Sequence, residues 1–192
     1  MNSNTKKMAV TAVFLALGTA LSFVKIWNMP MGGSVTLLSM LPIALVSITY
    51  GLKWGFTCSF LYSLIQLGFG ISIDGVLGWG LTPVVLIACF VFDYLLAFTA
   101  IGLAGLFRKK GVVGICAGIF IALAIRFASH WVSGAFLFAE WMPEQWSSPY
   151  LYSIVYNGAY MLPEIIFTMI GAVLLFKSPI IKKLIDDDSV SV

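Results

Sequence analysis

The sequence predicts an all-α integral membrane protein with six transmembrane helices. Hydrophobic residues make up 60% of its 192 positions and charged residues only 10%, whereas soluble domains carry roughly 25% charged residues. Apolar runs close to the length that a hydrocarbon core of about 30 Å requires occur six times, separated by charged or Pro/Gly-containing breaks. These observations exclude a water-soluble globule and indicate a single membrane domain over residues 1–192.

The expected spans are residues 8–27, 35–50, 54–71, 82–107, 112–137 and 151–176. The second is short, contains Pro42 and follows Met29-Pro30-Met31-Gly32-Gly33. We therefore expect part of it to be irregular backbone, which membranes tolerate where it lines a cavity. No loop has room for an ATPase domain, so any work that needs nucleotide requires a partner protein.

The distribution of basic residues predicts that both termini are cytoplasmic. With the N-terminus inside, the only basic residue of the outer loops is Lys25. The inner segments hold Lys6, Lys7, Lys53, Arg108, Lys109, Lys110, Lys177, Lys182 and Lys183. Such an excess of Lys and Arg marks the cytoplasmic side of multi-pass membrane proteins.

Composition also argues against several kinds of partner. A net charge of +3 is modest for a nucleic-acid-binding protein. Cys58, Cys89 and Cys116 each lie in an apolar run without CxxC spacing, so they predict buried hydrophobic residues and no metal site. We expect no metal, no cofactor and no nucleic-acid partner.

Four ionisable residues fall inside expected spans, where each costs at least a few kcal/mol unless it has a partner or a function. They are Asp93, Arg126, His130 and Glu164. Arg126 and His130 are four residues apart and share a helix face, as do Asn157 and Glu164 at a spacing of seven. The sequence therefore allows these side chains to converge on one interior cavity.

Two interpretations of these groups remain open. Arg126 and Glu164 could form a buried ion pair that only fixes helix packing. Alternatively, two acids facing one clear cation leave a carboxylate for a positively charged ligand. Neutral His130, with Asn157 and Tyr152, would then supply donors and acceptors for a heterocycle.

Aromatic residues concentrate around the loop between the last two spans. They are Trp131, Phe136, Phe138, Trp141, Trp146, Tyr150, Tyr152 and Tyr156. Such residues form interfacial belts in membrane proteins, and they also form boxes that bind cations through their ring faces. Both roles can apply to different rings, and the nearby His130 and Asn157 favour a pocket that opens outward.

A stripe of small residues runs along the first span at Ala12, Ala16 and Ala20. Small residues at this spacing let another helix approach closely. The stripe is either an internal packing seam or a docking face for a partner subunit.

Several longer motifs are more specific. They are Gly32-Gly33-Ser34-Val35-Thr36, Ser39-Met40-Leu41-Pro42-Ile43, Asp93-Tyr94-Leu95-Leu96-Ala97-Phe98, Arg126-Phe127-Ala128-Ser129-His130, Leu151-Tyr152-Ser153-Ile154-Val155-Tyr156-Asn157-Gly158 and Met161-Leu162-Pro163-Glu164. With these motifs, nearly the whole chain resembles the substrate-binding S-components of energy-coupling factor (ECF) transporters, and most closely the ThiT (YuaJ) thiamine family.

The resemblance implies a bacterial cell-membrane protein that binds thiamine at its outer side and has no enzymatic activity. Its implied partners are a transmembrane ECF coupling subunit, reached through the alanine stripe, and two ATPase subunits. The implied ligand contacts are Asp93, Tyr94, His130, Tyr152 and Asn157. A pocket tryptophan of some members is replaced by Phe138, so stacking is expected from Trp141, Trp146 or Trp131. Arg126 and Glu164 complete the candidate ligand-binding residues.

Thiamine binding buries most of a small ligand and therefore requires a lid. We expect Gly32, Gly33 and Ser34, together with the glycine-containing loop 72–81, to close over the site. Two other functions remain as alternatives: an S-component for another vitamin or a thiamine precursor, and an intramembrane enzyme such as a protease. The single histidine and the absence of a GxSxG motif disfavour the protease.

Overall fold

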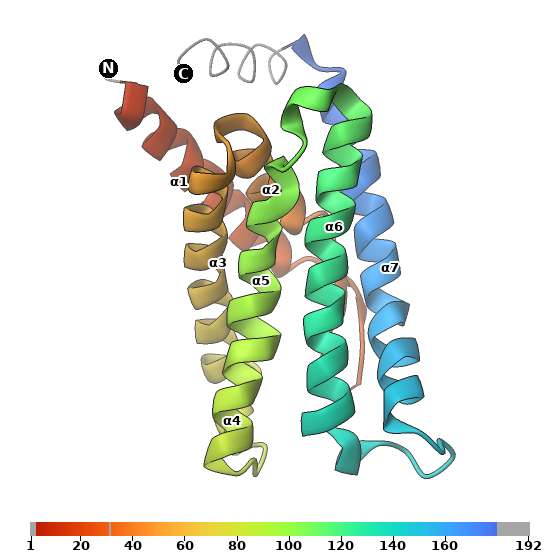
Figure 1. The fold of residues 1–192 in the computed structure, drawn as a ribbon. Helices are drawn as coiled ribbons and strands as arrows, with labels where there is room; N and C mark the ends of the chain where they lie inside the picture. Colours follow the sequence, from red (N-terminus) through yellow and green to blue (C-terminus); the bar gives the residue numbers. More distant parts are fainter. Residues whose placement is uncertain (1–2, 31, 180–192) are drawn as a thin grey trace.

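The computed structural model describes residues 3–30 and 32–179, which form an upright bundle of helices with a small β-hairpin (Figure 1). The elements are α1 (Ser3–Ser22), β1 (Lys25–Asn28), β2 (Ser34–Thr36), α2 (Met40–Tyr50), α3 (Leu52–Ser72), α4 (Pro83–Cys89), α5 (Ala97–Thr99), α6 (Gly111–Val132) and α7 (Pro149–Phe176). The predicted all-α membrane fold is confirmed, with the hairpin as an addition.

Within the described residues, four helical segments are long and apolar enough to cross a membrane. They are Leu52–Ser72, Pro83–Gly105, Arg108–Leu137 and Pro149–Phe176. They match the last four expected spans to within a few residues at most ends. Two of them begin where the sequence carries a helix-start signal, because Thr82 and Ser148 accept N-cap hydrogen bonds and a proline follows each.

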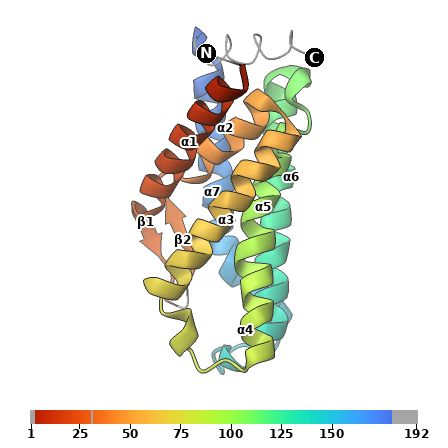
Figure 2. The same ribbon diagram turned by 90° about the vertical axis from the view of Figure 1, so that its left-hand side faces the viewer.

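The first expected span, residues 8–27, differs from the structure. Helix α1 ends at Ser22, and Lys25–Asn28 pairs antiparallel with Ser34–Thr36 instead of continuing the helix. The register places Trp27 opposite Val35 and Asn28 opposite Ser34. An apolar run does not by itself distinguish helix from strand. Strand β2 packs against α7, and Figure 2 shows the hairpin at the lower end of α1.

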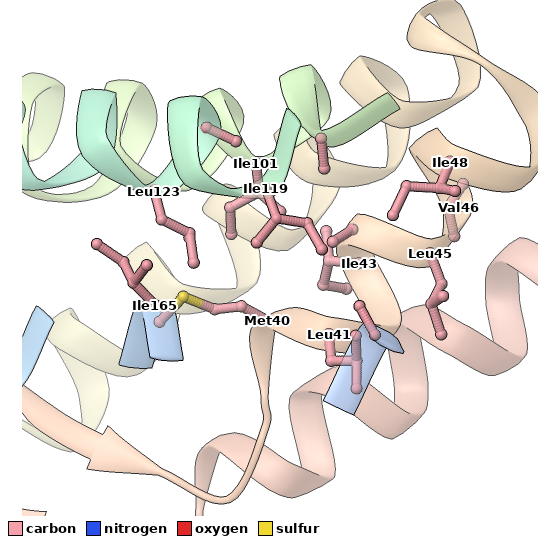
Figure 3. Close-up of a cluster of buried hydrophobic side chains, with 14 of the residues drawn as sticks. Met40, Leu41, Ile43, Leu45, Val46, Ile48, Ile101, Ile119, Leu123 and Ile165 are labelled. Carbon is pink, nitrogen blue, oxygen red and sulfur yellow. The ribbon is translucent and has the colours of Figure 1, made fainter. Parts of the chain in front are cut away.

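The second expected span, residues 35–50, contains the 11-residue helix α2, which is only about 16 Å long. All 11 residues are buried, as expected for a helix that is apolar on every face. Its side chains form the centre of the core with Ile101, Ile119, Leu123 and Ile165 from the surrounding helices (Figure 3). Irregular backbone precedes this helix, as the sequence predicts.

Two helical segments contain π-helical stretches, at Phe90–Leu96 and Ser133–Leu137. A π turn leaves backbone groups without their usual partners, and such turns occur often at functional sites. In the first stretch, the Phe92 carbonyl accepts a hydrogen bond of 2.5 Å from the Ser129 hydroxyl of α6. These stretches place Asp93 and Ser133 on facing helices.

The alanine stripe lies on the outside of α1. Ala12, Ala16 and Ala20 are exposed, whereas Gly18 faces α2, where an added methyl group would collide with Ile43. The stripe is therefore not the seam that joins α1 to the bundle.

Most basic segments and the acidic loops lie at opposite ends of the bundle. The start of α1, the α2–α3 turn, the segment Arg108–Lys110 and the end of α7 lie at one end (Figure 1). The loops that carry Asp74, Glu140 and Glu144 lie at the other end. We call these the basic end and the acidic end; residues 180–192, with Lys182 and Lys183, lie outside the described part.

Candidate functional site

A cavity of about 640 Å³ lies between the hairpin, α3, α6, α7 and the segment Pro83–Gly105. It lies within the size range typical of small-molecule sites, about 300–1,000 Å³. The predicted site residues that line it are Asp93, Tyr94, Arg126, His130, Phe138, Trp141, Tyr152, Asn157, Gly32, Gly33 and Ser34. Trp146 and Glu164 do not line it.

Asp93 is held from two sides on the cavity wall. The Ser133 hydroxyl donates to its Oδ2, and its Oδ1 lies 2.9 Å from His130 Nδ1. Both partners come from the Arg108–Leu137 segment, which faces the π-helical stretch that carries Asp93. A carboxylate accepts about four hydrogen bonds, so Asp93 retains capacity for a ligand.

Arg126 does not form the ion pair with Glu164 that the sequence left open. Its guanidinium lies 4.1 Å from the centre of the Phe98 ring, and Nη1 lies 2.6 Å from Met40 Sδ. Its Nε donates to His130 Nε2 over 3.3 Å. Spacing along one helix predicted that Arg126 and His130 share a face, but it did not reveal which groups of other helices meet them.

Glu164 instead holds the hairpin against α7. Its Oε1 accepts from both the backbone N–H and the hydroxyl of Thr36, and the hydroxyl contact is 2.7 Å. Glu164 is fully buried, and its Oε2 has no hydrogen-bond partner among the described residues. The carboxylate therefore anchors β2 from behind the cavity wall and does not reach the cavity itself.

Asn157 is fixed by hydrogen bonds on both sides of its amide. Nδ2 donates to the Ser153 carbonyl at 2.9 Å and to the Ser153 hydroxyl at 3.1 Å, while Oδ1 accepts from the Tyr160 hydroxyl at 2.7 Å. With its donors engaged, Asn157 offers the cavity one remaining acceptor position on Oδ1.

Aromatic rings form two groups at the cavity. Trp79, Phe138 and Trp141 make a three-ring cluster, with ring centres 5.4 to 6.2 Å apart. On α7, Tyr152, Tyr156 and Tyr160 follow one another at a spacing of four residues, with ring centres 5.6 and 6.5 Å apart. Trp146 does not line the cavity but packs against Tyr152, with ring centres 5.4 Å apart.

Both expected lid segments contribute to the cavity. Gly32, Gly33 and Ser34 line it from the hairpin, and the Gly32 carbonyl accepts a hydrogen bond of 2.9 Å from the Tyr156 hydroxyl. The loop 72–81 contributes Asp74 and Trp79. The structure thus brings both segments to the same cavity, while their closure on a ligand remains a prediction.

Comparison with known proteins identifies the family. The profile of the family described as "Thiamine transporter protein (Thia_YuaJ)" matches residues 8–183. The chain belongs to this family. It is 32% identical over 191 residues to the thiamine transporter ThiT of Bacillus subtilis (strain 168), with 90% of this chain and 93% of that protein covered. The predicted family is therefore confirmed, and it is a family of transport proteins.

A solved structure of ThiT from Listeria monocytogenes has the same fold as this Thia_YuaJ family member. Its TM-score is 0.77 at 23% sequence identity, with 96% of this chain and 99% of that chain covered. Family membership, together with the four long apolar segments of the described residues, indicates a multi-pass membrane protein.

Several cavity residues were missed by sequence reasoning. Trp79 was included only as part of a lid loop, yet it joins the aromatic wall. Gln66 and Phe98 line the cavity from α3 and from the Pro83–Gly105 segment. A polar Gln66 inside an expected span was an available signal, whereas Phe98 is one apolar residue among many. Among the described residues, no group of side chains is arranged to hold a metal ion.

Proposed function

We propose that this chain is the thiamine-binding membrane subunit of an ECF-type importer. It takes thiamine from the outer side of a bacterial cell membrane and passes it inward together with a coupling subunit and two ATPase subunits. Family membership and the similarity to Bacillus subtilis ThiT support this function.

The observation that carries the proposal is a carboxylate in an aromatic-lined cavity of a membrane bundle. Asp93 can meet the thiazolium charge or the amino group of thiamine, and the Asn157 Oδ1 is a second acceptor. The rings of Trp79, Phe138 and Trp141 can lie against a flat cationic ligand. A cavity that combines the Asp93 carboxylate with aromatic rings suits a ligand that carries a positive charge and N–H donors.

The cavity is proposed to open outward. The basic end of the bundle would then face the cytoplasm, together with both termini, because Lys and Arg mark the inner side. The cavity residues Asp74, Trp79 and Trp141 belong to the loops of the acidic end, which would face outside.

The exposed alanine stripe of α1 supports the second part of the proposal. Ala12, Ala16 and Ala20 present a smooth surface that is not used inside the bundle. A helix of the coupling subunit could approach closely along this surface.

A titration with the purified protein tests thiamine binding. We expect thiamine to quench tryptophan fluorescence at submicromolar concentration, because Trp79 and Trp141 line the cavity. Asp93→Asn keeps the size of the side chain but removes its charge and replaces one acceptor oxygen by an NH2 donor. It should weaken binding by about 1–3 kcal/mol, or roughly 5- to 150-fold in Kd.

The control is Glu144→Gln, which removes a carboxylate from an exposed position in a loop of the same end. It should leave the Kd unchanged. An Asp93→Asn variant that binds thiamine as tightly as the unaltered protein would contradict the proposed site. A protein that responds to riboflavin or to a pyrimidine precursor, but not to thiamine, would be an S-component for that other vitamin.

A further inference from the structure

The only histidine of the chain lies between a guanidinium and a carboxylate. Arg126 Nε contacts His130 Nε2 at 3.3 Å, and His130 Nδ1 contacts Asp93 Oδ1 at 2.9 Å. A guanidinium has five N–H donors and no acceptor. His130 Nε2 must therefore be the acceptor in the contact with Arg126.

A neutral imidazole carries its proton on one nitrogen and accepts through the other. With Nε2 accepting from Arg126, the proton lies on Nδ1 and is donated to Asp93. We infer that Arg126 is a positioning residue, which fixes His130 as the Nδ1-protonated tautomer and thereby leaves only the imidazole ring face for a ligand. This inference rests on the proposed function only for the identity of the ligand.

Arg126 is itself held firmly enough for this role. Arg126 is 6% exposed, and its side chain packs on the Phe98 ring and reaches Met40 of α2. These contacts come from two elements other than its own helix. Because Arg126 precedes His130 by one helical turn, its Nε lies beside the imidazole without any change in backbone.

The polar groups of the site differ in which hydrogen-bonding positions they leave open for a ligand. Both nitrogens of His130 are engaged, so the imidazole can stack on a ligand but cannot hydrogen-bond to it. Asp93 receives donors from His130 and Ser133 and keeps its remaining lone pairs for the ligand. The donors of Asn157 are engaged with Ser153. At Asp93 the site therefore favours a ligand group that brings an N–H donor or a positive charge.

Nuclear magnetic resonance measures the tautomer directly. Because the chain has one histidine, a sample labelled with ¹⁵N-histidine gives signals from His130 alone. A long-range ¹H–¹⁵N correlation spectrum of the ligand-free protein distinguishes the two ring nitrogens. We expect a single species protonated at Nδ1 and unprotonated at Nε2. A species protonated at Nε2 would overturn the inference.

Two variants separate the effect of Arg126 from that of Asp93. In Asp93→Asn, Arg126 still requires an acceptor at Nε2, so the Nδ1-protonated species should persist. A shift to the Nε2-protonated species in this variant would show that Asp93 alone sets the tautomer, and it would overturn the inference. In Asp93→Asn combined with Arg126→Met, both tautomers should appear.

The matched control is Arg108→Met, which removes a guanidinium at the basic end and should leave the His130 spectrum unchanged. All spectra are recorded without thiamine. A failure of thiamine binding would therefore leave the tautomer measurement intact, and the proposed function and this inference can fail separately.

Discussion

Gly32 and Gly33 share a left-handed backbone conformation but have different surroundings. Their φ angles are +89° and +84°. A methyl group added to Gly32 would meet nothing within 4 Å, whereas one added to Gly33 would collide with the Tyr160 ring. At Gly33 the hairpin thus leaves no room for a side chain beside the Tyr160 ring, whose hydroxyl hydrogen-bonds to Asn157.

This difference predicts the outcome of two alanine substitutions. Gly32→Ala adds only backbone strain, about 1–2 kcal/mol. Gly33→Ala adds a similar strain and also pushes the hairpin away from Tyr160, so it should weaken thiamine binding further, by about tenfold. Titrations of both variants followed by tryptophan fluorescence measure the difference. Equal Kd values for the two variants would show that the contact with Tyr160 does not shape the site.

For single residues, the sequence predicted which polar residues lie at the cavity better than it predicted which side chains they contact. Asp93, His130 and Asn157 were predicted as site residues because polar groups are costly inside a membrane. All three line one cavity. The partner of Glu164 was unpredictable, because Thr36 lies 128 residues away on a strand that the sequence did not indicate. Helical spacing assigns residues to a face, but only the packed bundle shows what that face meets.

Helix α1 buries one face against α2 and leaves another face exposed. Gly18 faces Ile43 of α2, and the alanine stripe points away from the bundle. We predict that Ala16→Trp preserves thiamine binding by the isolated protein but prevents assembly with the coupling subunit, because the large side chain separates the two helices.

The measurement is co-purification with the coupling subunit and the two ATPase subunits, alongside thiamine titration. Ile170→Trp, at an exposed position of α7, is the control and should assemble normally. Normal assembly of Ala16→Trp would remove the stripe from the proposed interface. Loss of assembly in both variants would show a general effect of bulky surface residues.

The elements differ in how well the sequence predicts them. The spans beginning near residues 54, 82, 112 and 151 have long apolar runs with capping or charged residues at their ends, and they were predicted closely. The hairpin was missed because Val24, Ile26 and Trp27 are as apolar as the helix before them. The two π-helical stretches carry no distinct sequence pattern, although they position Asp93 and Ser133.

The whole molecule is polarised, with basic residues at one end and acidic loops at the other. We predict that Lys109→Cys is cytoplasmic and Glu144→Cys is external, in a chain whose native cysteines are replaced by alanine. A membrane-impermeant maleimide should label Glu144→Cys in intact cells and Lys109→Cys only after the cells are permeabilised. The reverse pattern would invert the proposed orientation and place the cavity loops on the cytoplasmic side.

The burial of α2 also has a consequence for biogenesis. A helix of 11 residues is too short to be inserted as an independent transmembrane segment, and every one of its residues is covered by protein. We therefore expect α2 to enter the membrane only together with neighbouring helices that cover it, such as α3. The helix at the centre of the core thus depends on its neighbours for its place in the membrane.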